Sequence, residues 1–265
     1  MKNYTDRLRV AALPLDIVNG DKEANLKAVE EALQTLPQGT DIVVLPELFS
    51  TGYVDSPEAL ASMSERNTQQ TVALIHAWAD AAGCAFAGSF LASTAPNIYN
   101  RAFFIEPNGD ETFCDKRHLF SLSSESRNLR RGDTPLRTVR FRGWNVAMAV
   151  CYDIRFPVWC RNVGCEYDIL LVPANWPQVR AYAWEHLLIA RAIENQSAVV
   201  GANRGGEDRF GLYDGLTFAF DCLGRPVAKA SADSPWVTAD FSKIKQDELR
   251  RTFPVSADAD SFTIR

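Results

Sequence analysis

The stretch NVAMAVCYDIRFP, residues 145–157, decides the fold and holds the first candidate for chemistry. It opens with small and β-branched apolar residues at 146–150, which predict a buried strand. The run stops at Cys151, and Pro157 suits the first turn of a helix, so we expect a strand-to-helix turn and a helix near residues 157–163. On such a turn the sulfur faces a cleft, and nearby backbone N–H groups favour the nucleophilic thiolate. The same cysteine also fits a small buried hydrophobic residue, because most free cysteines are buried.

The composition indicates a soluble globular protein with reduced cysteines. The chain has 265 residues, of which 46% are apolar, enough for a sizeable core. Its net charge of −5 argues against nucleic acid or an anionic membrane as a partner. Residues 1–9 lack the apolar core of a signal peptide, and no apolar run is long enough to span a bilayer. Six scattered cysteines without a CxxC pair indicate a cytoplasmic chain with no zinc site.

Apolar periodicity and turn residues predict helices and strands that alternate along the whole chain. The predicted strands are residues 8–13, 41–45, 85–90, 99–105, 112–115, 136–141, 145–150, 168–172, 198–203, 216–222, 225–230 and 236–240. The predicted helices are residues 21–36, 68–82, 157–163, 181–195 and 243–251. This alternation predicts one α/β domain over residues 1–265, ending in a tail at 253–265. We expect two sheets with helices outside, because so many strands would make a single open sheet very wide. There is no GxGxxG and no Walker loop, so nucleotide binding has no support.

Three reactive side chains come at or just after the ends of predicted strands: Glu47, Lys116 and Cys151. In α/β folds such strand ends line the ligand crevice. A carboxylate beside a thiol can take its proton and return it to a leaving amine, and an ammonium can stabilise the developing oxyanion. Each residue also has a simpler interpretation, because Glu47 suits the first turn of a helix and most loop lysines are solvated. Three matching chemical types at three strand ends favour a shared site.

Seven segments in order along nearly the whole chain carry a resemblance to a known family. They are PELF (46–49), TGY (51–53), DKRHLF (115–120), VCYDIRFP (150–157), ANWP (174–177), RAIEN (191–195) and NR (203–204). At these residues the chain resembles the nitrilase (carbon-nitrogen hydrolase) superfamily. Within that superfamily, these motifs are most similar to those of the omega-amidase branch. Those enzymes deamidate dicarboxylic monoamides such as 2-oxoglutaramate and 2-oxosuccinamate. The resemblance implies a four-layer α-β-β-α sandwich of the nitrilase type.

The resemblance also implies roles for the strand-end residues. Glu47 corresponds to the general base and acid, Lys116 to the oxyanion-stabilising cation and Cys151 to the nucleophile. The family has a second glutamate seven residues before a glycine, and Glu125 stands at that distance from Gly132. Its implied role is to orient Lys116 or the substrate amide, and the alternative is a solvated loop acid. The resemblance implies a small-molecule amide substrate and water, no cofactor or metal, and a homodimer.

The residues that contact the substrate are less well determined by sequence. Tyr152, Asn175 and Trp176 are candidate pocket walls, although Trp176 also suits core packing. Arg155 either holds the distal carboxylate of the substrate or pairs with an internal acid that braces the turn, and we favour the second. Residues 213–217 (YDGLT) depart from the family's Tyr-x-Gly-x-Ser pattern, which leaves either substrate detail or an interface contact open.

Three alternatives to an omega-amidase-like hydrolase stay open at this point. The same three residues could act on an N-carbamoyl compound, an aliphatic amide or a nitrile. A binding or redox-sensing protein would need only an oxidisable Cys151, with Glu47 and Lys116 incidental. A papain-like hydrolase needs a histidine base, but none of the three histidines follows a strand end as Glu47 does.

Overall fold

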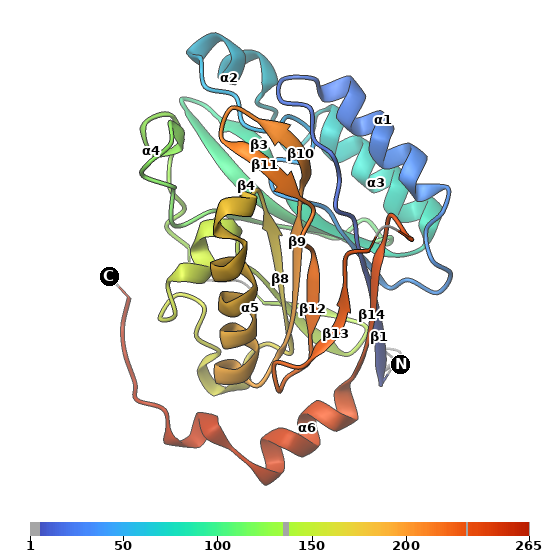
Figure 1. The fold of residues 1–265 in the computed structure, drawn as a ribbon, viewed down its shortest axis with the longest axis vertical. Coiled ribbons are helices and arrows are strands. Elements are labelled where there is room, and N and C mark those ends of the chain that lie inside the picture. Colours follow the sequence, from blue (N-terminus) through green and yellow to red (C-terminus); the bar gives the residue numbers. More distant parts are fainter. Residues whose placement is uncertain (1–5, 135–137, 232, 265) are drawn as a thin grey trace.

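The computed structural model describes residues 6–134, 138–231 and 233–264. Two six-stranded sheets pack face to face, with α1 (Lys22–Leu33) and α3 (Gln70–Ala82) outside one sheet and α5 (Ala181–Asn195) outside the other (Figure 1). This is the α-β-β-α sandwich expected from the sequence. The structure therefore confirms the predicted fold class.

Strand order places chain segments from both halves of the sequence beside each other. The first sheet runs β14 (Val237–Ser242), β1 (Arg7–Ala12), β2 (Ile42–Val44), β3 (Ala85–Thr94), β4 (Asn97–Ile105), β5 (Glu111–Asp115). The second runs β13 (Pro226–Lys229), β12 (Phe218–Phe220), β9 (Ala198–Asn203), β8 (Ile169–Ala174), β7 (Trp144–Met148), β6 (Thr138–Phe141). Within each sheet the central strands are parallel: β1 with β2 and β3, and β7 with β8 and β9. Their carboxyl ends therefore meet at one edge of each sheet.

The side-chain alternation of β1 explains why two layers of core form. Val10 and Ala12 point into the cluster between the two sheets, whereas Ala11 points into the cluster beneath α1 and α3. Because successive side chains of a strand face opposite sides, one buried strand contributes to both layers. A buried parallel strand therefore reads as a continuous apolar run.

The structure corrects several details of the sequence prediction. No helix spans residues 157–163; a 3₁₀-helix already begins at the cysteine, Cys151–Arg155, and Val163–Cys165 is a separate 3₁₀ turn. The Asp153 carboxylate accepts the backbone N–H of Val150 at 3.1 Å, which turns the chain before the proline is reached. Of the strand predicted at 136–141, residues 136–137 lie outside the described chain.

Two α-helices and two strands do not appear in the sequence prediction. They are α2 (Pro57–Met63), α4 (Glu125–Asn128) and the hairpin β10 (Gly205–Asp208) with β11 (Gly211–Asp214). The last helix, α6 (Lys243–Thr252), is where it was predicted. In the tail after it, Val255–Asp258 forms one 3₁₀ turn, and Arg265 lies outside the described residues.

Candidate active site

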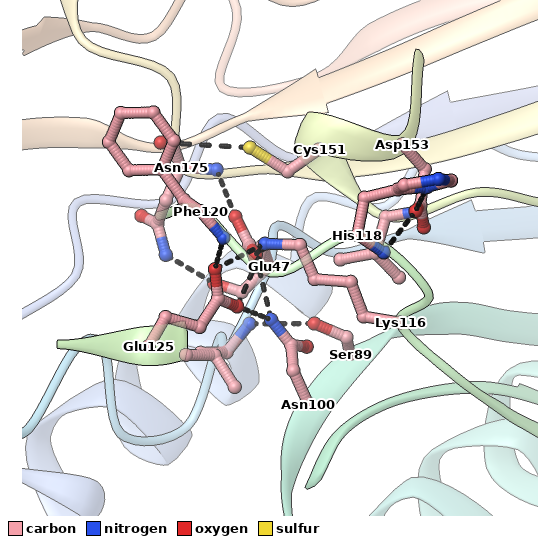
Figure 2. A network of polar contacts seen from close by, with 12 residues as sticks. Glu47, Ser89, Asn100, Lys116, His118, Phe120, Glu125, Cys151, Asp153 and Asn175 are labelled. Atoms are coloured by element: carbon pink, nitrogen blue, oxygen red, sulfur yellow. Dashed lines mark hydrogen bonds and ion pairs between the residues drawn. The ribbon is translucent and has the colours of Figure 1, made fainter. Parts of the chain in front are cut away.

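The three predicted strand-end residues lie together at the edge where the two sheets face each other. Glu47 follows β2, Lys116 follows β5, and Cys151 comes three residues after β7 (Figure 2). All three side chains are at least 94% buried. The backbone of Cys151 has φ 47°, and that of Leu48, beside Glu47, has φ 49°. L-residues rarely adopt this left-handed conformation, so the two strained turns aim the reactive groups.

Lys116 lies between two carboxylates. Its Nζ donates to Glu47 Oε1 at 2.7 Å and to both oxygens of Glu125, at 2.8 and 2.9 Å. Asn100, buried in the middle of β4, donates from Nδ2 to Glu47 at 2.7 Å and to Glu125 at 3.2 Å. The backbone N–H of Phe120 donates to Glu125 Oε2 at 2.8 Å. Glu125 is therefore a buried partner of Lys116 and not a solvated loop acid.

The two carboxylates determine the charge of Lys116. Burial lowers the pKa of this ammonium, but the charges of Glu125 and Glu47 outweigh burial and raise the pKa well above its ordinary value. Lys116 is therefore cationic at neutral pH. A buried cation suits stabilisation of an oxyanion.

Glu47 is held from both sheets. Its Oε2 accepts the backbone N–H of Asn175 at 2.9 Å, and its backbone oxygen accepts Asn175 Nδ2 at 2.8 Å. The Tyr53 hydroxyl donates to Oε1 at 3.1 Å. Burial raises the pKa of Tyr53, and the charges of Glu125 and Glu47 raise it further, so the hydroxyl keeps its proton. These contacts fix the carboxylate in one orientation beside the sulfur.

The surroundings of Cys151 favour the neutral thiol. Burial raises the pKa of Cys151 well above its ordinary value, and the Glu47 carboxylate raises it further, while Lys116 opposes both. The turn alone favours a thiolate, whereas burial and the neighbouring carboxylate favour the protonated form. Its Sγ lies 3.9 Å from the backbone oxygen of Asn175. Because Glu47 is the carboxylate beside it, the thiol can lose its proton to Glu47 at the moment of attack.

The residues predicted to bind substrate all line one pocket above the sulfur, which also holds aromatic side chains the prediction did not include. The lining includes Tyr152, Arg155, Asn175 and Trp176 from the prediction, with Tyr53, Phe120, Arg180, Phe210 and Tyr213 in addition. Trp176 serves both interpretations, because it lines the pocket and its ring centroid lies 5.3 Å from that of Trp184 in the core. Phe210 and Tyr213 come from the unpredicted hairpin of β10 and β11. Asn175 Oδ1 is buried with no hydrogen-bond partner among the described residues.

The structure contradicts the ion pair with an internal acid that we favoured for Arg155. No acid pairs with it within the described ranges; its guanidinium Cζ lies 4.7 Å from the ring centroid of Trp176. At residues 213–217, where the chain departs from the family's Tyr-x-Gly-x-Ser pattern, the structure shows the place of the threonine. Thr217 is buried, and its hydroxyl accepts the backbone N–H of Asn203 at 2.9 Å. Thr217 does not line the pocket.

The histidines do not supply a base for Cys151. His118 Nδ1 lies 2.8 Å from Asp153 Oδ1, and its ring stacks on Phe156 at 3.7 Å. The same Asp153 oxygen accepts the backbone N–H of His118 at 2.9 Å, so this pair ties the segment after Lys116 to the turn of Cys151 (Figure 2). His76 contacts Glu111, and His186 contacts the backbone of its own helix.

The described chain offers no group of three His, Cys, Asp or Glu side chains placed to hold a metal ion. None of its helices has the length and apolar character that a membrane crossing requires.

Comparison with known proteins decides the family. The family model described as carbon-nitrogen hydrolase matches residues 9–247. This chain belongs to that family. It is 38% identical over 259 residues to the omega-amidase YafV of Escherichia coli, covering 97% of this chain and 98% of the relative. It is 30% identical to the 2-oxoglutaramate amidase of Bacillus subtilis, covering 94% and 96%.

A solved structure supports the same family assignment as the sequence relatives. The crystal structure of XC1258 from Xanthomonas campestris, described as a CN-hydrolase superfamily protein with an arsenic adduct in the active site, superposes with a TM-score of 0.92 at 35% identity. The match covers 98% of this chain and all of that one. The prediction of a carbon–nitrogen hydrolase, an enzyme of the amidase kind, is confirmed. A non-catalytic binding or redox-sensing protein does not fit this membership.

Proposed function

We propose that this carbon-nitrogen hydrolase cleaves the side-chain amide of dicarboxylic acid monoamides of the 2-oxoglutaramate and 2-oxosuccinamate type. The relatives named omega-amidase and 2-oxoglutaramate amidase support this substrate class. The observation that carries the chemistry is the buried Lys116 ammonium, held between Glu47 and Glu125 beside the Cys151 thiol. Such a group combines a nucleophile, a base and a fixed positive charge.

The reaction follows from the positions of these groups. Glu47 takes the proton of Cys151 as Sγ bonds to the amide carbon. Lys116 faces the negative charge that develops on the amide oxygen. Glu47 then returns the proton to the amide nitrogen, the carbon–nitrogen bond breaks, and ammonia leaves a thioester on Cys151. Water, deprotonated by Glu47, attacks the thioester, and the dicarboxylate and the thiol are released. The sum is amide plus water to carboxylic acid plus ammonia.

Glu125 and Asn175 support this cycle in different ways. Glu125 is buried, contacts Lys116 with both oxygens and accepts the backbone N–H of Phe120, so we assign it to holding the ammonium in place. Asn175 fixes Glu47 through two hydrogen bonds.

The direct test is replacement of the nucleophile. Cys151→Ala is expected to abolish ammonia release from 2-oxoglutaramate while the circular dichroism spectrum stays that of the wild type. Cys114→Ala is the matched control, because Cys114 lies in β5 outside the substrate pocket, and it is expected to keep full turnover. Turnover by Cys151→Ala equal to the wild type would refute the proposal.

The alternative within the family is another small substrate: an uncharged amide, an N-carbamoyl compound or a nitrile. Measuring kcat/KM for each of these compounds and for 2-oxoglutaramate discriminates between the two substrate classes. A higher kcat/KM for uncharged amides than for carboxylate-bearing ones would favour the alternative.

We further propose that residues 1–265 form one catalytic domain that works in the cytoplasm as a homodimer. All six cysteines are free, which suits a reducing compartment. On the outer side of α5, Tyr182 and Ile193 are 77% and 52% exposed, which offers apolar surface to a second copy. Sedimentation equilibrium tests the assembly: the mass of two chains supports a dimer, and the mass of one chain contradicts it.

A further inference from the structure

Two arginines of the substrate pocket have no acidic partner. Arg155 ends the 3₁₀-helix that Cys151 begins and is half-buried, with its guanidinium against the ring of Trp176. Arg180 is exposed, and its Cζ lies 5.4 Å from the ring centroid of Phe120. Within residues 6–134, 138–231 and 233–264, no carboxylate forms an ion pair with either guanidinium.

Other arginines at similar or greater depth are paired. Their ion pairs are Arg101 with Asp115 at 2.6 Å, Arg191 with Glu194, Arg204 with Asp208 at 3.4 Å, and Arg250 with Asp168 at 2.8 Å. A guanidinium removed from water with its N–H donors unused carries a desolvation cost that a bound anion would offset. Arg155 is therefore an exception that points to a ligand.

The pocket has a gradient from floor to rim that fits a two-ended substrate. Cys151 is 6% exposed at the floor, Arg155 is half-buried on the wall, and Arg180 is exposed. Four residues along a 3₁₀-helix separate the Cα atoms of Cys151 and Arg155 by roughly 8 Å along its axis. That spacing suits a short chain with an amide at one end and an anion at the other. No described residue lining the pocket is an acid that would repel the anion.

We propose that Arg155 binds the far carboxylate of the substrate and that Arg180 attracts it at the rim. The inference rests on the proposed function and names the residues that select its substrate class. The Arg155 guanidinium lies over the ring of Trp176, and no described acid uses its N–H donors, so they are available for a bidentate carboxylate. Trp176 is itself fixed, because its backbone N–H donates to Asn203 Oδ1 at 2.7 Å and its indole N–H donates to the backbone oxygen of Arg180 at 2.9 Å.

The two arginines differ in what they contribute. Arg155 is half-buried and held by Trp176, so its bond to a carboxylate is weakly screened by salt. Arg180 is exposed, so its attraction is modest and depends on ionic strength. The structure therefore assigns specificity to Arg155 and a smaller, salt-dependent effect to Arg180.

The experiment compares glutaramate, a monoamide with one carboxylate, with glutaramide, the neutral diamide of the same length. In Arg155→Gln, kcat/KM for glutaramate is expected to fall roughly 10- to 100-fold, the range for losing hydrogen bonds to a charged group. Hydrolysis of glutaramide is expected to change little, which shows that the variant is folded and its catalytic residues work. Arg155→Lys keeps the charge without the planar fork and is expected to lie between the two.

Arg180→Gln is expected to lower kcat/KM for glutaramate only a few-fold, and the loss should disappear in high salt. Arg140→Gln is the matched control, because this exposed arginine lies on β6 beside Asn145, away from the pocket, and changes net charge equally. Equal losses on both substrates in Arg155→Gln, or no loss on glutaramate, would overturn the inference. A wild-type protein that cleaves glutaramide but not glutaramate would overturn the inference and the diacid substrate class while leaving the amidase. A protein that cleaves neither would overturn the proposed function as well.

Discussion

The floor and the rim of the pocket differ in whether their charged side chains have partners within the protein. On the floor, Glu47, Lys116 and Glu125 are at most 2% exposed, and every charged oxygen and nitrogen has a partner that holds it. On the wall and the rim above it, Arg155 and Arg180 have aromatic neighbours but no counter-ion in the described chain. The charged groups of the floor are paired without a ligand, whereas the two arginines above it would be paired by one.

This difference indicates that the paired floor residues carry out the reaction and that the unpaired arginines select the substrate. Catalytic groups that are fixed before substrate arrives do not reorganise during the reaction, which is the main source of electrostatic stabilisation in enzymes. Unpaired cations on the wall gain a partner only from the correct substrate, which is how a binding site rejects its competitors. Changes to the floor should therefore affect all substrates, and changes to the rim should affect only some.

The largest effect is expected from Lys116→Met. The substitution leaves Glu47 and Glu125 buried side by side without their cation, which is expected to cost about 3–5 kcal/mol in the free energy of unfolding. Loss of the oxyanion-stabilising charge should lower kcat roughly 100- to 1,000-fold for every amide. Denaturant unfolding and ammonia release measure the two effects.

A double variant and a surface control test the reason for that loss. Lys116→Met with Glu125→Gln is expected to regain part of the stability, because one of the two facing charges is gone. Lys27→Met removes an exposed lysine that pairs with Glu31, and about 1 kcal/mol or less is expected. If Lys116→Met were no more destabilising than Lys27→Met, the buried charge arrangement would be wrong.

Glu125→Gln is expected to have an intermediate effect. Lys116 keeps Glu47 but loses one charged partner, so kcat should fall roughly 10- to 100-fold. KM should stay near the wild-type value, because Glu125 does not line the pocket. Steady-state kinetics with glutaramate and glutaramide separate these terms. A rise in KM for one substrate alone would show that Glu125 contributes to substrate binding and does not only hold Lys116.

The smallest effect is expected from Tyr53→Phe. Tyr53 belongs to both regions, because its hydroxyl donates to Glu47 and its ring centroid lies 6.5 Å from that of Phe210. Phenylalanine keeps the ring and removes one hydrogen bond, so kcat/KM should fall roughly 2- to 10-fold for both substrates. Tyr99→Phe, a tyrosine outside the pocket, is the control and should match the wild type. A loss confined to glutaramate would show that the hydroxyl serves binding and not Glu47.

Sequence reasoning could predict the floor because strand ends collect at one edge of a parallel sheet. Glu47, Lys116 and Cys151 each follow a strand, and the structure brings them together. Asn100 lies in the middle of β4, where nothing in the sequence distinguishes it from a strand residue. The raised pKa of Cys151 could not be predicted either, because the turn shows neither how deeply the sulfur is buried nor how closely Glu47 approaches it.

The rim was harder to predict because it comes from segments without periodicity. The hairpin of β10 and β11 lies in GGEDRFGLYD, residues 205–214, which lacks the alternation of a half-buried strand. α2 did carry a signal, since Ser56 caps it and Pro57 begins it, but its seven residues are few for an apolar stripe. The helix predicted at 157–163 relied on a proline rule, and the contact of Asp153 with Val150 turned the chain earlier.

The central claim is that burial and Glu47 together keep Cys151 protonated at rest, and that Glu47 receives its proton during attack. The most direct measurement is the pH dependence of Cys151 alkylation by iodoacetamide in the wild type and in Glu47→Gln. A raised pKa means that the thiol keeps its proton to higher pH, so the wild-type rate should still be rising well above the ordinary thiol range. In Glu47→Gln the negative neighbour is gone and Lys116 remains, so the pKa of Cys151 should fall and the curve should move to lower pH while amide turnover is lost. Coincident curves for the two proteins would contradict the account.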